Sequence, residues 1–149
     1  MSHRLFARRL PVIGLIGLTC ICLGCQRSPF EFAPAAGVVT LDGEPLANAR
    51  VTLGPQRQGD SLVAGPDSSG VTDAEGRFIL TALSGETGAV VGSHKVRIST
   101  LRTEFREGSE AAVMTSPERV PRKYRSRERF TATVPSGGRE DLLFELTSD

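Results

Sequence analysis

The sequence predicts an all-β domain, a sandwich or barrel, that follows a short N-terminal export segment. After residue 25 no stretch of about 10 to 12 residues shows a sustained helical period. Apolar side chains instead alternate with polar ones in several short segments, and Gly, Pro and Asp stand between these segments. This pattern is typical of strands in two packed sheets, which bury the alternating apolar side chains between them.

The N-terminal segment has the layout of a bacterial secretory signal. Arg4, Arg8 and Arg9 precede an uncharged apolar run, residues 10–24, which ends directly before Cys25. A membrane-spanning helix needs about 20 apolar residues, whereas the apolar region of a signal has about 7 to 15. The run therefore fits a signal. The alternative is a buried core helix, but such a helix would need an amphipathic face, and this run is apolar all round.

The end of this run, Cys22-Leu23-Gly24-Cys25, resembles the processing motif of bacterial lipoprotein precursors. In that motif Leu, a small residue and Gly or Ala precede the cysteine. Gly24 and Cys25 match the motif, whereas Cys22 and Leu23 depart from it. The resemblance implies a signal peptide over residues 1–24 and a thioether-linked diacylglycerol on Cys25.

Further acylation of that N-terminus would anchor the protein stably to a membrane outside the cytoplasm, because more than one chain is needed for stable anchoring. Gln26 stands where an inner-membrane retention signal usually has Asp, which favours the outer membrane. The competing processing site is Ala33-Pro34-Ala35, and cleavage after it would release a soluble secreted protein.

Composition narrows the class of protein further. The chain has 149 residues, and the 125 that remain after residue 24 are enough for one domain with its own core. The formal charge falls from +1 to −2 when the three arginines of the signal leave, which argues against general nucleic-acid binding. Cys20 and Cys22 leave with the signal and Cys25 is used by the lipid, so no thiol or disulfide is expected in the mature domain.

Residues 25–36 are expected to form a tether and residues 37–149 the β-domain. The sequence turns to β-rich or alternating segments after the tether, with a weaker candidate at 61–64. The expected strands are 37–41, 49–53, 77–81, 94–98, 130–134 and 142–146. Tight turns are expected at Asp42-Gly43, 73–76 and 135–138. The charged segment 102–117 breaks the pattern, and residues 111–114 are expected to form one helical turn.

Several of these blocks occur in the order found in one family. The blocks are 37–51, 71–78, 91–98 and Val120-Pro-Arg-Lys-Tyr124, followed by the closing strand, turn and strand. Together they resemble the carboxypeptidase regulatory-like, or transthyretin-like, domain of small bacterial lipoproteins, from Gly37 to Leu146. The resemblance implies a seven-stranded, prealbumin-like β-sandwich. It also implies a non-catalytic role, since the family is named after an accessory domain beside a catalytic carboxypeptidase domain.

Two motifs suggest catalysis or metal binding, and each has a simpler interpretation. Gly59-Asp-Ser61-Leu matches a short esterase motif, but an activated serine needs a histidine and a carboxylate at suitable spacing, and His94 is the only histidine after Cys25. Residues 73–76 resemble part of a calcium loop, but the EF-hand spacing does not continue. We therefore expect no metal site and no cofactor, and keep a small esterase-type hydrolase using Ser61 as the alternative function.

One run of cations could contact an anionic surface. Its members are Arg122, Lys123, Arg125 and Arg127, flanked by Arg119 and Arg129. Anionic lipid head groups or an acidic polymer would suit such a run. The alternative is a solvated connecting loop, because arginine is common throughout the chain.

The sequence thus predicts a non-catalytic, lipid-anchored protein of the cell envelope that serves as a binding or structural module. Its expected partners are the membrane, through the lipid, and an envelope protein or polymer; no nucleic acid is expected. The ligand and the oligomeric state are left open.

Overall fold

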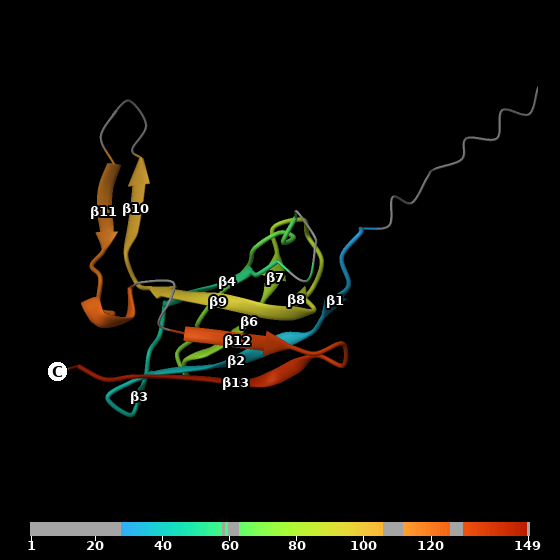
Figure 1. Cartoon of the computed structure of the whole chain (residues 1–149). Helices are drawn as coiled ribbons and strands as arrows, with labels where there is room; N and C mark the ends of the chain where they lie inside the picture. Colours follow the sequence, from blue (N-terminus) through green and yellow to red (C-terminus); the bar gives the residue numbers. More distant parts are fainter. Residues whose placement is uncertain (1–27, 58, 60–62, 106–111, 126–129, 149) are drawn as a thin grey trace, which may run out of the picture.

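The computed structural model describes residues 28–57, 59, 63–105, 112–125 and 130–148. Over these ranges the chain forms β-strands and one short 3₁₀ helix, η1 (Arg122–Tyr124), and no α-helix (Figure 1). The all-β prediction is confirmed, and the strands are arranged as in a sandwich, with sheets on either side of a buried core.

The first sheet has five antiparallel strands in the order β12-β9-β4-β5-β7. They are β12 (Phe130–Val134), β9 (Gly92–Ser99), β4 (Arg50–Pro55), β5 (Ser68–Val71) and β7 (Thr81–Ala82). β9 is the longest of them, and its residues alternate between the buried and the outer face, as the sequence predicts for 94–98.

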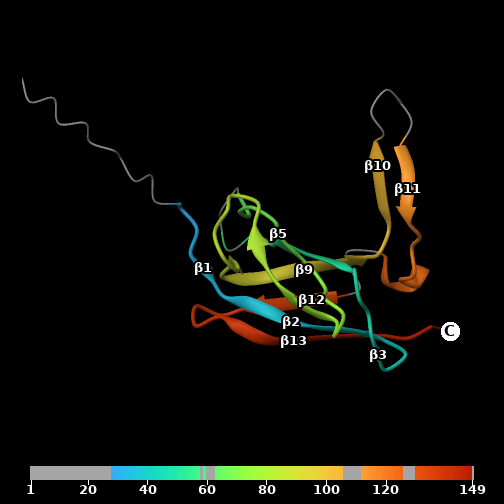
Figure 2. The ribbon, with the colours of Figure 1, turned by 180° about the vertical axis from the view of Figure 1, so that it is seen from behind.

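The second sheet is built around β2 (Ala35–Leu41). β13 (Arg139–Leu146) lies parallel to β2 on one side, and β3 (Glu44–Pro45) and β6 (Arg77–Ile79) lie antiparallel to it on the other. Figure 2 shows β2 and β13 running side by side beneath the first sheet. Two parallel strands need a long connection between them, and here the chain from β3 to β12 connects β2 to β13.

The core lies between the two sheets and uses the apolar residues that the alternation predicts. The first sheet contributes Val51, Leu53, Val96, Ile98, Ala132 and Val134, and the second contributes Val39, Phe78, Leu142, Phe144 and Leu146. The aromatic rings pack on one another: Phe144 contacts both Phe78 and Phe130, with ring centroids 6.0 and 5.6 Å apart.

The turn at residues 73–76 forms as predicted, and the Asp73 carboxylate hydrogen-bonds to the backbone of the turn. Asp73 Oδ1 accepts hydrogen bonds from the backbone N–H groups of Glu75 (3.0 Å) and Arg77 (2.8 Å). Gly76 has a φ of +72°, and a Cβ there would lie 2.5 Å from the carbonyl oxygen of Val39. Glycine is therefore required, and the turn is structural.

The β-structure begins earlier than Gly37. β1 (Phe32–Ala33) pairs with β8 (Ala89–Val90), and Ala33 and Ala35 are buried. The second half of the range 25–36, expected as a tether, is thus part of the domain. Local sequence does not show this, because the partner strand lies more than 50 residues further along the chain.

The expected helical turn at residues 111–114 is wrong. Ala112–Ser116 forms strand β11, which pairs with β10 (Arg102–Phe105) in a hairpin that projects from the sandwich (Figure 1). Most side chains of both strands are exposed, including Phe105 (74%) and Met114 (62%). With neither face buried, no alternation is imposed on the sequence, and the strands were not predicted.

The Glu118 carboxylate fastens the base of this hairpin. Its Oε1 accepts a hydrogen bond from the backbone N–H of Thr100 (2.9 Å), and its Oε2 accepts one from the Ser99 hydroxyl (2.6 Å). Burial disfavours the ionised form, but the hydrogen bonds from Ser99, Thr100 and Val120 outweigh it and lower the pKa of Glu118 below its ordinary value.

Candidate functional site

The N-terminal segment is held against the sandwich at Phe30, five residues after Cys25. A Cβ on Gly65 would lie 3.2 Å from Cδ1 of Phe30 and 3.1 Å from Cγ2 of Val90, so both side chains pack over a residue with no side chain of its own. Gly65 also has a φ of +97°, which favours glycine. The backbone continues this attachment, because Glu31 O accepts a hydrogen bond from Val91 N (2.8 Å).

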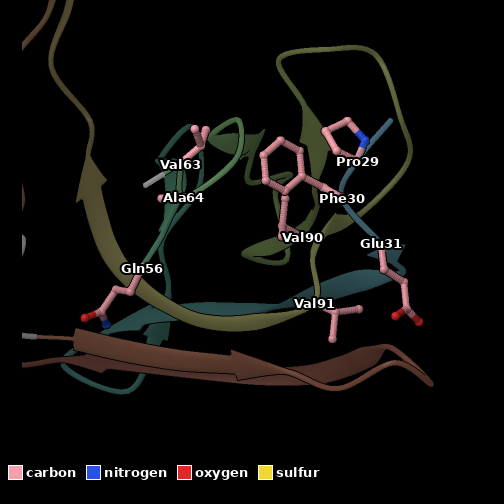
Figure 3. A pocket seen from close by; sticks show the side chains of 8 residues that line it. All are labelled: Pro29, Phe30, Glu31, Gln56, Val63, Ala64, Val90 and Val91. Atoms are coloured by element: carbon pink, nitrogen blue, oxygen red, sulfur yellow. The ribbon is translucent and has the colours of Figure 1, made fainter. Parts of the chain in front are cut away.

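A hollow of about 250 Å³ lies beside this attachment point. Figure 3 shows Phe30 and Pro29 on one side of it, Val63 and Ala64 on the other, and Val90 next to the Phe30 ring. Its lining residues are Pro29, Phe30, Glu31, Gln56, Val63, Ala64, Val90 and Val91. Most of these side chains are apolar, and Glu31 and Gln56 are the polar side chains among them.

Two loops beside the attachment point expose apolar side chains to solvent. Val63 is 62% exposed and Leu83 is 78% exposed. The loops are joined by the backbone, since Leu83 N donates a hydrogen bond to Asp67 O (2.9 Å), two residues after Gly65. Sequence reasoning did not select these residues; an isolated apolar residue in a turn, such as Leu83 before Ser84-Gly85, was the available signal.

His94 lies inside the sandwich and is fully buried. Its Nε2 is 2.6 Å from the carbonyl oxygen of Val90, which can only accept, so Nε2 carries the proton and Nδ1 is left without a partner among the described residues. Burial lowers the pKa of His94 below its usual value, while the Val90 carbonyl and Asp67 act in the opposite direction. A neutral, inward-facing imidazole on a strand is a structural element of the core.

Of the residues considered for the alternative hydrolase, Asp60 and Ser61 lie outside the described residues. Within the described ranges there is no group of three or more His, Cys, Asp or Glu side chains that could hold a metal ion.

The described part of the cationic run, Arg122 to Arg125, lies at the opposite end of the sandwich from β1, beside the base of the hairpin (Figures 1 and 2). Arg125 Nε donates to Val120 O (2.9 Å), and Lys123 Nζ donates to Thr147 Oγ1 (3.3 Å) and lies 5.2 Å from the centroid of the Tyr124 ring. Two members of the predicted cationic run, Lys123 and Arg125, therefore make hydrogen bonds within the domain.

Arg122 is exposed at the start of η1, whereas Arg127 and Cys25 lie outside the described residues. The contact of Arg122, Lys123, Arg125 and Arg127 with an anionic surface and the lipid on Cys25 thus remain predictions.

Comparison with known proteins identifies no family. No family model and no curated protein matches the sequence. One solved structure, a 9R-lipoxygenase from Cyanothece PCC8801, is similar at a TM-score of 0.40 with 17% identity, over 79% of this chain and 16% of that chain. A likeness this low carries no argument about function. In the described part of the chain, no helix has the length and apolar character needed to cross a bilayer.

Proposed function

We propose that this protein is a non-catalytic, lipid-anchored module of the cell envelope, with the lipid on Cys25 and a seven-stranded, prealbumin-like sandwich of the carboxypeptidase regulatory-like type. The observation that carries this proposal is the basic, apolar and small-residue segment that ends at Cys25. The order of these three parts suits export and lipid attachment, with the outer membrane as the favoured destination.

The start of the folded domain supports processing at Cys25 over processing after Ala35. Cleavage after Ala35 would remove all of β1 and the first residue of β2. It would also remove the buried side chains of Ala33 and Ala35 and the carbonyl of Pro34, which accepts a hydrogen bond from Arg139 N (2.8 Å). Cleavage before Cys25 leaves all of these contacts in place.

The burial of His94 and the hydrogen bonds of His94 and Asp73 support a binding or structural role over a catalytic one. His94, the only histidine after Cys25, is fully buried and its Nε2 donates to the backbone carbonyl oxygen of Val90, so it is a poor general base. The Asp73 carboxylate is used within its turn. The proposed work of the domain is therefore to bind or position an envelope protein or polymer.

Replacement of single cysteines in the full-length chain tests the proposal. Cys25→Ser removes the acceptor for the lipid, and we expect the protein to leave the membrane fraction or to accumulate as the unprocessed precursor. Cys20→Ser is the matched control, because it changes a cysteine of the apolar run that lies outside the four-residue processing motif and keeps the acceptor. Equal membrane attachment of both variants, with identical N-termini, would contradict the proposal.

A further inference from the structure

We propose that the end of the sandwich that carries Val63 and Leu83 rests directly on the lipid surface, and that these two side chains enter the interfacial layer. This proposal rests on the proposed lipid anchor at Cys25. It adds the orientation of the domain and a second, non-covalent membrane contact.

The length of chain between the lipid and the domain sets the distance from the bilayer. Three peptide units separate Cys25 from Ser28, the first described residue, and a fully extended chain spans at most about 3.6 Å per residue, or about 11 Å for this segment. Phe30 is already fixed against Gly65 and Val90. A lipid on Cys25 therefore holds this end of the sandwich within a short distance of the head groups.

The side chains at this end suit an apolar contact. Leu83 is 78% exposed and Val63 is 62% exposed, and both lie on loops that are connected to the Phe30 site through Gly65 and the Leu83 N to Asp67 O hydrogen bond. Transfer of exposed apolar side chains from water to the acyl boundary is favourable, and the free energy released is proportional to the apolar area that is buried.

The charges at this end point to a contact that does not depend on anionic lipid. Glu31 belongs to the N-terminal segment and Asp67 to the loop that is bonded to Leu83, and both would be repelled by an anionic surface. Arg57, which follows Gln56 of the hollow, is an exposed cation nearby and offsets one of these charges. The cations of η1 lie at the other end of the sandwich (Figures 1 and 2). An apolar contact at the Leu83 end is insensitive to salt, whereas contact through exposed cations weakens as salt screens them.

Tryptophan fluorescence provides a direct test, because the chain contains no tryptophan. The full-length protein with Leu83→Trp, purified from membranes, is reconstituted into phosphatidylcholine vesicles whose acyl chains are either plain or brominated. Phe105→Trp is the matched control: its side chain is similarly exposed (74%) but lies on the hairpin, at the other end of the sandwich. Vesicle flotation and the intact mass report separately whether the protein is anchored and lipidated.

We expect the Leu83→Trp emission to shift to shorter wavelength on the vesicles and to be quenched by the brominated lipid, at low and high salt alike. The Phe105→Trp emission should remain as in solution. If the protein is lipidated and floats, but Leu83→Trp is not quenched, the proposed contact is wrong while the anchor stands. Quenching of Phe105→Trp alone would show the opposite orientation and would also overturn the proposal. A protein without lipid that does not float contradicts both the anchor and the contact.

Discussion

Replacing Thr72 by Val is expected to destabilise the domain by about 2 to 6 kcal/mol. Thr72 is 3% exposed, and its hydroxyl makes two hydrogen bonds to the backbone: it donates to Leu46 O (2.6 Å) and accepts from Ala49 N (2.8 Å). Leu46 and Ala49 are themselves buried. Valine has the same shape but leaves both backbone groups without this partner, at about 1 to 3 kcal/mol for each buried unsatisfied group.

Thr72→Ser is the control, because it keeps the hydroxyl and removes only a methyl group, which costs about 1 kcal/mol. Urea unfolding of the two variants and the original protein, followed by circular dichroism, gives the midpoint and the slope for each. The expected order of stability is the original protein, then Thr72→Ser, then Thr72→Val, with an unchanged slope. If Thr72→Val is as stable as Thr72→Ser, the hydroxyl does not bridge these two backbone groups and the reasoning is refuted.

Three further predictions concern the hairpin, the N-terminal strand and catalysis. Because the pKa of Glu118 is lowered in the folded state, its carboxylate stabilises the folded protein fully above the ordinary value of 4.5, and this stabilisation is lost as the pH falls through the lower folded-state value. Glu118→Gln should therefore make the free energy of unfolding depend less steeply on pH at acid pH. The same dependence in the variant and the original protein would contradict this. Gly88→Ala should lower the thermal midpoint, because φ is +94° and the new Cβ would lie 2.0 Å from Ala33 O; a midpoint equal to that of the original protein would show that β1 does not require glycine there. Purified protein should not turn over ester or peptide substrates, and turnover that Ser61→Ala abolishes would establish the hydrolase instead.

The strands that bury one face could be predicted from the sequence. In β9, His94, Val96 and Ile98 alternate with exposed or half-buried residues, and in β13 Leu142, Phe144 and Leu146 do the same. One buried face imposes the period of two on the sequence, so the pattern is visible without knowledge of the partner strands.

The remaining elements depend on contacts that local sequence does not show. β1 is only two residues long and is stabilised by pairing with Ala89–Val90. The β10–β11 hairpin exposes most of its side chains, so its residues carry no burial pattern. The Phe30 site brings together three separate segments, at Phe30, Gly65 and Val90, and proximity of this kind follows from the fold alone.

The lipid on Cys25 is predicted from the sequence alone, from the order of the residues that precede this cysteine, because Cys25 lies outside the described residues. The domain begins early, at β1, so the connection between the anchor and the sandwich is shorter than the range 25–36 that the sequence predicts.

Intact-mass analysis of the membrane-bound protein shows whether Cys25 is the lipidated N-terminus. We expect a chain that begins at Cys25, lacks residues 1–24 and carries the added mass of a diacylglycerol and a further acyl chain. A mass that corresponds to a chain beginning at Ala36 or at Met1, with no lipid added, would contradict it.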